Sequence, residues 1–142
     1  MPVRDRLFTR IGTSDDFERN VSTFLMECSE TSFILDRVTP QSLVLIDELG
    51  RGTSEREGFV LAWATCERLL QSNAYTFFVT HYHKMTELAM LYPRCMNFHM
   101  RASLTQKRIE FAYSLVDGPS PVKTDYGRFS SFVIGTFISV YL

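Results

Sequence analysis

The sequence contains little cysteine, and its cysteines are poorly arranged for chemistry. Only Cys28, Cys66 and Cys95 occur among its 142 residues, and they form no CxxC pair. Their odd number and wide spacing argue against a zinc site or a disulfide framework, and favour a reducing compartment. We interpret each cysteine as a small core residue rather than as a nucleophile.

Long apolar runs and an excess of charge are also missing. No stretch reaches the roughly 20 apolar residues that span a bilayer, and the first residues lack the apolar core of a signal peptide. We therefore expect no membrane partner. The 15 Lys and Arg residues against 16 Asp and Glu leave a net charge of -1, which gives no electrostatic reason for direct DNA binding by this segment. With 45% hydrophobic and 22% charged residues, the composition is that of one globular domain.

An apolar run at residues 43–46 leads directly into two acidic residues, Asp47 and Glu48. The run predicts a strand buried on both faces, and carboxylates at its tip are costly unless a cation or a hydrogen-bond partner meets them. Ligands of open α/β sheets bind beyond the carboxyl ends of the strands. The pattern favours the Walker B arrangement of a nucleotide hydrolase, with Asp47 holding magnesium and Glu48 orienting or deprotonating a water. The alternative is a strand that simply ends in acidic turn residues.

A second apolar strand is predicted at Tyr75–Thr80, after a helix over residues 59–70 that Asn73 ends. The strand–helix–strand order predicts parallel neighbours in an α/β sheet. His81 follows the second strand, so it should lie at the same sheet edge as the acidic pair, within reach of a phosphate or a water. A loop histidine without function is the alternative, and a metal site made from His81 and His83 lacks further ligands.

Upstream, residues 3–13 contain a short predicted strand, and a helix is predicted over residues 23–37. Asn20, Ser22 and Thr23 are suitable N-cap residues for that helix, with Phe24, Cys28, Thr31 and Leu35 on one face. The hydroxyls and free N–H groups at its start would suit a phosphate, although a plain helix cap explains them as well.

The second half predicts a short helix over residues 84–91 and then an antiparallel hairpin. Its strands are predicted at residues 95–100 and 108–115 around a turn at residues 103–106, with Ile109, Phe111, Tyr113 and Leu115 on one face. Residues 129–142 carry no charge. They predict either a buried helix or strand, or an exposed apolar tail that self-associates.

The run SLVLIDELGRGTSEREG at residues 42–58 resembles the signature of the MutS DNA mismatch-recognition proteins. The Leu91-Tyr92-Pro93 stretch tilts the resemblance toward the meiotic MutS homologues. Further similar segments, in the same order as in the family, are DRLFTRIG at residues 5–12, Asp15-Asp16, STFLMEC at residues 22–28, Ala62-Trp63-Ala64, Thr80-His81-Tyr82, Asn97-Phe98-His99, Phe111-Ala112-Tyr113 and Asp125-Tyr126-Gly127.

The resemblance implies a partial P-loop NTPase domain of the ABC type, with a parallel sheet, flanking helices and a C-terminal antiparallel hairpin. Its nucleotide sites would lie between two subunits, with ATP and Mg2+ as cofactors. The resemblance implies that Asp47 coordinates magnesium, Glu48 activates water and His81 is the switch histidine that senses the terminal phosphate. It implies that Ser22 and Thr23 contact the partner's ATP, and that the loop of Arg51, Gly52 and Thr53 passes from one nucleotide site to the other. His99 would lie near the adenine.

Two features depart from the family pattern. The family's phosphate-binding loop, GxxxxGK followed by Ser or Thr, precedes the DRLFTRIG segment, and no such loop occurs in this sequence. Residues 129–142 do not resemble the charged region that follows in the family. We therefore divide the chain into a partial MutS-type ATPase domain at residues 1–128 and a divergent apolar tail at residues 129–142, and expect a fragment or shortened product that is inactive alone.

The function expected is that of an ATPase segment of a MutS-like protein, in ATP-dependent recognition of mismatched or branched DNA during mismatch repair or meiotic recombination. Its partners would be another MutS homologue subunit and, through a full-length parent, DNA; its location would be nuclear in a eukaryote and otherwise cytoplasmic. A second hypothesis is a catalytically inactive module that completes a partner's ATP site or mediates dimerisation. A third, another ABC-type ATPase of a transporter or chromosome-maintenance kind, is disfavoured because the LSGGQ-like signature is absent.

Overall fold

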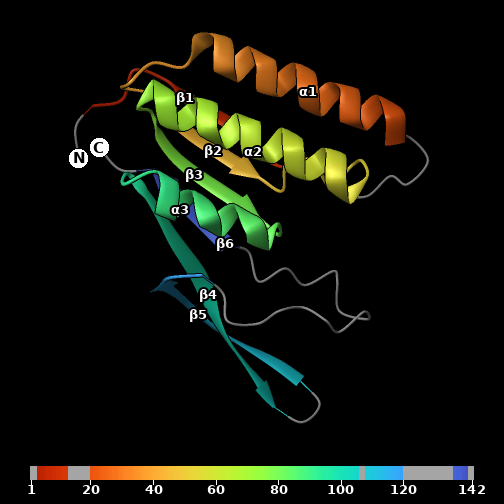
Figure 1. The fold of residues 1–142 in the computed structure, drawn as a ribbon, viewed down its shortest axis with the longest axis vertical. Helices are drawn as coiled ribbons and strands as arrows, with labels where there is room; N and C mark the ends of the chain where they lie inside the picture. The colour runs from red at the N-terminus through yellow and green to blue at the C-terminus, as the bar shows by residue number, and fades with distance from the viewer. Residues whose placement is uncertain (1–2, 13–19, 106–107, 120–135, 141–142) are drawn as a thin grey trace.

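The computed structural model describes residues 3–12, 20–105, 108–119 and 136–140. They form a six-stranded mixed sheet in the order β1-β2-β3-β6-β4-β5 (Figure 1). The strands are β1 (Leu7–Arg10), β2 (Leu43–Asp47), β3 (Tyr75–Thr80), β4 (Cys95–Thr105), β5 (Arg108–Asp117) and β6 (Thr136–Val140). β1, β2 and β3 are parallel neighbours, whereas β6 runs antiparallel to both β3 and β4. The predicted α/β class is confirmed, but only three strands of the sheet are mutually parallel neighbours.

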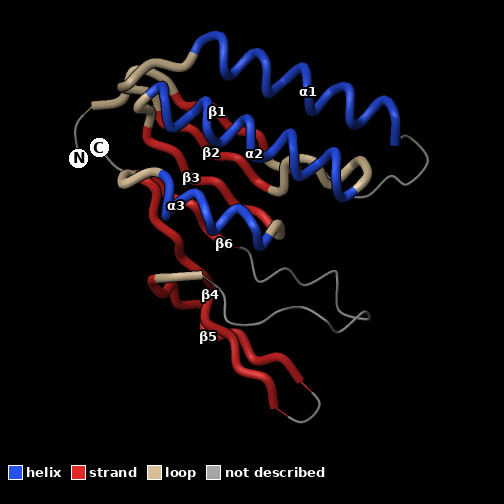
Figure 2. Tube along the Cα trace, in the orientation of Figure 1, coloured by secondary structure: helices blue, strands red, loops and turns tan. Residues whose placement is uncertain are grey.

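Among the described residues, the helices lie on one side of the sheet (Figures 1 and 2). They are α1 (Asn20–Arg37), α2 (Glu55–Ser72), the 3-10 helix η2 (His83–Glu87) and the short α3 (Leu88–Leu91). α2 begins before the predicted residue 59, because Ser54 caps it and accepts a hydrogen bond from the Glu57 amide. It ends as predicted at Asn73, whose φ of 59° is left-handed.

The core lies between the sheet and these helices. Val44 and Ile46 of β2 and Phe78 of β3 are at most 1% exposed, and they pack with Cys66 and Leu69 of α2. Burial of each such side chain stabilises the fold by about 1.5–3 kcal/mol.

The opposite face of the sheet is not sealed in the same way. Leu7 of β1, Phe77 of β3 and Met96 of β4 are 62%, 42% and 43% exposed, and Leu43 and Leu45 of β2 are half-buried. The prediction that β2 is buried on both faces is therefore wrong. The described helices cover one face only, so burial alternates along the strand.

α1 has the predicted inner face but a different start. Phe24, Cys28 and Leu35 are half-buried and Thr31 is buried. The helix already begins at Asn20, so Ser22 and Thr23 lie in its first turn rather than at the N-cap.

The hairpin of β4 and β5 is longer than predicted and extends away from the helices (Figure 1). Residues 103–105, predicted as turn, belong to β4. The register shifts between Met100 and Ala102, and Tyr113 has a φ of 48°. In the backbone register, Ile109, Phe111 and Leu115 pair with every second residue of β4 from Leu104 back to Met100.

For the uncharged end of the chain, the strand interpretation holds at residues 136–140. β6 lies between β3 and β4 and makes the hairpin part of the same sheet. Residues 129–135 and 141–142, like Asp15-Asp16 and Asp125-Tyr126-Gly127, lie outside the described residues. No helix in the described part of the chain is both long and apolar enough to cross a membrane.

Candidate functional site

The ends of β2 and β3 bring the predicted catalytic residues to one edge of the sheet. Asp47 pairs with Val79 in the parallel ladder, and the Glu48 amide donates a 3.0 Å hydrogen bond to the Val79 carbonyl. His81 directly follows Thr80, the last residue of β3. The structure thus places Asp47, Glu48 and His81 together, as the strand–helix–strand order predicted.

Asp47 lies where negative charge is crowded. Burial, and next the charge of Glu48, raise the pKa of the half-buried Asp47 carboxyl, while Arg10 and Arg51 act against this rise. A cation beside Asp47 would relieve the crowding. In the described part of the chain, no three His, Cys, Asp or Glu side chains are grouped so that they could hold a metal ion. A magnesium ion at Asp47 would therefore take most of its ligands from water or phosphate, as this ion usually does.

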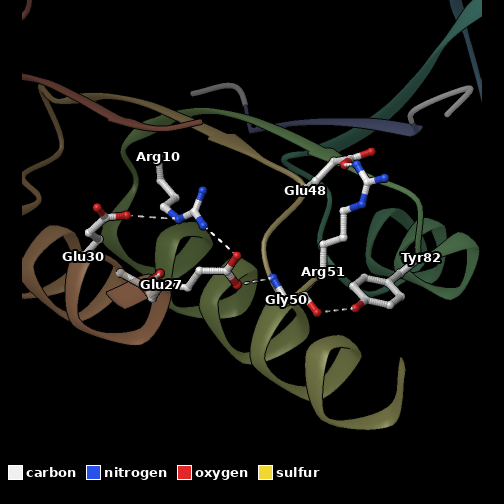
Figure 3. A network of polar contacts seen from close by, with 8 residues as sticks. Arg10, Glu27, Glu30, Glu48, Gly50, Arg51 and Tyr82 are labelled. Carbon is white, nitrogen blue, oxygen red and sulfur yellow. Dashed lines mark hydrogen bonds and ion pairs between the residues drawn. The ribbon is translucent and has the colours of Figure 1, made fainter. Parts of the chain in front are cut away.

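Glu48 is held in an unusual conformation and carries a partner. Its φ is 48°, in the left-handed region, which costs a non-glycine residue about 1–2 kcal/mol. Its carboxylate forms an ion pair with the Arg51 guanidinium at 2.6 Å (Figure 3). The Glu48 side chain is 16% exposed and that of Arg51 is 46% exposed, so solvent reaches this pair.

His81 is exposed, yet its ring lies against neighbouring groups. The ring centroids of His81 and Tyr82 are 4.1 Å apart. Burial among these neighbours lowers the pKa of the His81 imidazole, whereas the nearby charge of Glu48 acts in the opposite direction. A lowered pKa favours the neutral ring at pH 7, which can both donate and accept a hydrogen bond.

The residues predicted to face a partner's nucleotide lie at the start of α1. A Cβ atom at Gly52 would lie 3.9 Å from the backbone nitrogen of Phe24, which places Gly52 beside Thr23. The Thr53 hydroxyl donates to the Glu57 carboxylate at 2.8 Å, at the cap of α2. For Ser22 only the backbone position in α1 is described.

His99 of β4 lies level with Thr80, the last residue of β3, and β6 separates the two strands. Thr80 and His99 both pair with Thr136 of β6, which puts their backbones about 10 Å apart at the usual strand spacing. Its Nδ1 atom is 3.0 Å from the Gly118 carbonyl oxygen. This contact holds the ring against the end of β5.

Sequence reasoning missed a buried ion pair behind this edge. The Arg10 guanidinium lies 2.7 Å from the Glu27 carboxylate, and both side chains are 6% exposed. Glu30, which is 55% exposed, contacts the same arginine at 3.1 Å. Glu27 lies between Phe24 and Thr31 on the apolar face of α1, and that position is the signal that could have revealed it.

Two polar side chains also hold the Gly50 peptide between them (Figure 3). The Gly50 amide donates to the second oxygen of Glu27 at 3.1 Å, and the Tyr82 hydroxyl donates to the Gly50 carbonyl at 3.0 Å. Gly50 has a φ of 89°, and a Cβ atom there would lie 2.6 Å from Gly58. Glycine is required at both positions because α2 approaches the loop so closely.

Most of the chain matches a known class of domain. The family model of MutS domain V matches residues 1–135. The chain belongs to the MutS family.

A particular relative narrows this assignment. The chain is 44% identical over 133 residues to the DNA mismatch repair protein MSH4 of Arabidopsis thaliana. The match covers 94% of this chain and 17% of the relative, so the chain spans about a sixth of the relative's length. Membership of the MutS family, inferred from the motifs, is confirmed by the match to the family model.

Proposed function

We propose that this chain is the ATP-hydrolysing segment of a MutS-type protein that acts in DNA mismatch repair or meiotic recombination. One observation carries the proposal. In a chain of the MutS family, two carboxylates and a histidine meet at the carboxyl ends of adjacent parallel strands. Crevices at this edge are where α/β sheets bind ligands.

Asp47, Glu48 and His81 have separate roles in this proposal. Asp47 binds magnesium, directly or through water, because its carboxylate stands at the end of β2 beside Glu48 and the end of β3. Bound Mg2+ neutralises charge on the ATP phosphates. Glu48 orients and deprotonates the attacking water. His81, as a neutral imidazole, donates a hydrogen bond to the terminal phosphate and so reports its presence.

Glu48 must exchange its partner before it can act as a base. In the structure its carboxylate is bound to Arg51. A solvent-exposed pair of this kind contributes about 1 kcal/mol or less, so a water held against a phosphate can replace the arginine. Arg51, Gly52 and Thr53 then form the loop between two nucleotide sites.

Groups other than Asp47, Glu48 and His81 would complete the ATP site. Ser22 and Thr23 at the start of α1 contact the ATP of a second MutS subunit, and His99 lies near the adenine. The backbone cradle for the phosphates comes from elsewhere, because this sequence contains no GxxxxGK loop. The whole protein reaches mismatched or branched DNA through other regions, and its place is the nucleus of a eukaryotic cell.

The test uses a chimera in which this chain replaces the matching 133 residues of the Arabidopsis relative. We expect Glu48→Gln to slow ATP turnover by about 10²–10⁴-fold while nucleotide binding is retained. The matched control is Glu87→Gln, which changes an exposed carboxylate on η2 and should leave turnover unchanged. Normal turnover in Glu48→Gln would remove Glu48 as the base. The 142-residue chain alone should give no turnover.

A second function is favoured by the contact between Gly52 and the start of α1. The loop at Gly52 and the start of α1 come together without a phosphate-binding loop. The chain would therefore supply these two segments to the ATP site of an intact partner. The chain is mixed with a MutS homologue that has its own GxxxxGK loop, and association is measured with and without ATP. ATP should tighten association, and Arg51→Ala should weaken this response. Equal association in both conditions would count against this function.

A further inference from the structure

We propose that Glu27 and Tyr82 are positioning residues for hydrolysis, which hold the two ends of the Gly50 peptide and thereby set the turn that carries Glu48. The inference rests on the proposed function, because it assumes that Glu48 acts on the attacking water. It assigns roles to a helix residue and a loop residue that lie outside the predicted set of site residues.

The first step is that Glu27 is buried without an evident need for stability. Its carboxylate and the Arg10 guanidinium are both 6% exposed. Apolar side chains of similar volume often stabilise a fold as well as a buried ion pair does, because desolvation offsets the attraction between the charges. A pair retained in the core therefore points to a task that requires its geometry. The second oxygen of Glu27 shows that task, since it accepts the Gly50 amide.

The second step is that the Gly50 peptide controls the turn after β2. The Arg51 amide donates to the Glu48 carbonyl at 3.3 Å, so residues 48–51 form one tight turn with Gly50 at its third position. Leu49, inside the turn, is completely buried. With the Gly50 amide and carbonyl both fixed, the left-handed backbone of Glu48 has little freedom to relax.

The third step is that the same contacts connect three parts of the site. Glu27 lies on α1, whose first turn contains Ser22 and Thr23. Tyr82 follows His81 directly, and the two rings are in contact. A displacement of α1 by a nucleotide or a partner would therefore act on the Gly50 peptide, and through it on Glu48.

Kinetics of the chimera test this role. In Glu27→Gln the amide oxygen can accept from Arg10 or from Gly50, but its NH2 group then faces the other donor. We expect kcat to fall by about tenfold to 100-fold, with KM for ATP and nucleotide affinity changed less than about twofold. Glu30→Gln is the matched control, because it removes the exposed carboxylate that pairs with the same arginine, Arg10. It should leave kcat unchanged.

A second readout needs no ATP. Hydrogen exchange of the Gly50 amide, followed by NMR in the full 142-residue chain, should become about tenfold faster in Glu27→Gln and remain unchanged in Glu30→Gln. If Glu27→Gln does not fold, Tyr82→Phe decides. It removes one hydroxyl and keeps the ring contacts with Phe59 and His81, and kcat should again fall with KM unchanged.

The two proposals can fail separately. If Glu48→Gln abolishes turnover while Glu27→Gln and Tyr82→Phe keep the wild-type kcat, the positioning role is overturned and the proposed function stands. If Glu48→Gln turns over normally, Glu48 is removed as the base, and the positioning role falls with that assignment even where Gly50 exchange still responds to Glu27. If the wild-type chimera itself shows no ATP turnover, the proposed function fails. A parallel loss of kcat in all three variants, with Glu30→Gln unaffected, supports both.

Discussion

Two ion pairs of almost equal length lie beside the turn that follows β2, and they differ in nearly everything else. The Arg10–Glu27 pair is 2.7 Å long with both side chains 6% exposed, whereas the Arg51–Glu48 pair is 2.6 Å long with side chains 46% and 16% exposed. The buried pair is largely shielded from water, and its glutamate also holds the Gly50 amide. The exposed pair can exchange, and it contains the proposed base. Distance alone does not reveal which pair is structural and which can open.

The largest effect should come from removing one half of the buried pair. Arg10→Met leaves the Glu27 carboxylate buried without its cation, which should lower the free energy of unfolding by about 3–5 kcal/mol. The double variant Arg10→Met/Glu27→Met should recover most of this loss, because no charge is left buried. Urea unfolding of both variants measures the difference. Equal stability of Arg10→Met and wild type would mean that the pair is not buried in solution.

The close approach beneath the turn should give the next largest effect. A Cβ atom at Gly58 would lie 2.1 Å from the Tyr82 hydroxyl and 2.2 Å from the Gly50 carbonyl oxygen. Gly58→Ala should therefore lower the free energy of unfolding by about 1–3 kcal/mol. Gly12→Ala is the control, since among the described residues nothing beyond its chain neighbours lies within 4 Å of a Cβ at Gly12. Similar unfolding midpoints for the two variants would argue against the packing of α2 on the loop.

The exposed pair should contribute far less than the buried one. Arg51→Met should change the free energy of unfolding by less than about 1 kcal/mol, and this difference should shrink further in high salt. The same urea titration, repeated at low and high ionic strength, provides the measurement. A loss as large as that of Arg10→Met would erase the distinction between the two pairs.

The smallest effect is electrostatic and appears at His81. Its pKa is lowered in the folded protein, chiefly by burial, so the unfolded chain binds more protons just below the ordinary value of 6.5. The stability that the neutral ring contributes is complete above pH 6.5, and it is lost as the pH falls from there to the folded pKa. Glu48→Gln should lower the pKa of His81 further, and Arg51→Met should raise it. NMR titration of the ring measures these shifts, and no response to either variant would separate His81 from the exposed pair.

The amino-acid sequence by itself determined which residues meet at the candidate site. Parallel strands joined by a helix end at the same side of a sheet, so the apolar runs before Asp47 and His81 sufficed to place them together. The α/β class, the end of α2 at Asn73 and membership of the MutS family also followed from local patterns. The start of α2 at Glu55 is equally local, since Ser54 and Glu57 have the spacing of a capping box.

Only the tertiary structure decided what lies behind that edge. A glutamate on a helix ordinarily faces solvent, and Glu27 is buried only because Arg10 and the Gly50 amide, both far away in sequence, meet it. The same holds for the half-buried outer face of β2 and for β6, which lies between β3 and β4. Periodicity indicates which face of a helix or strand a side chain occupies. The partners that meet a buried side chain lie far away in the sequence, and they are brought to it only when the chain folds.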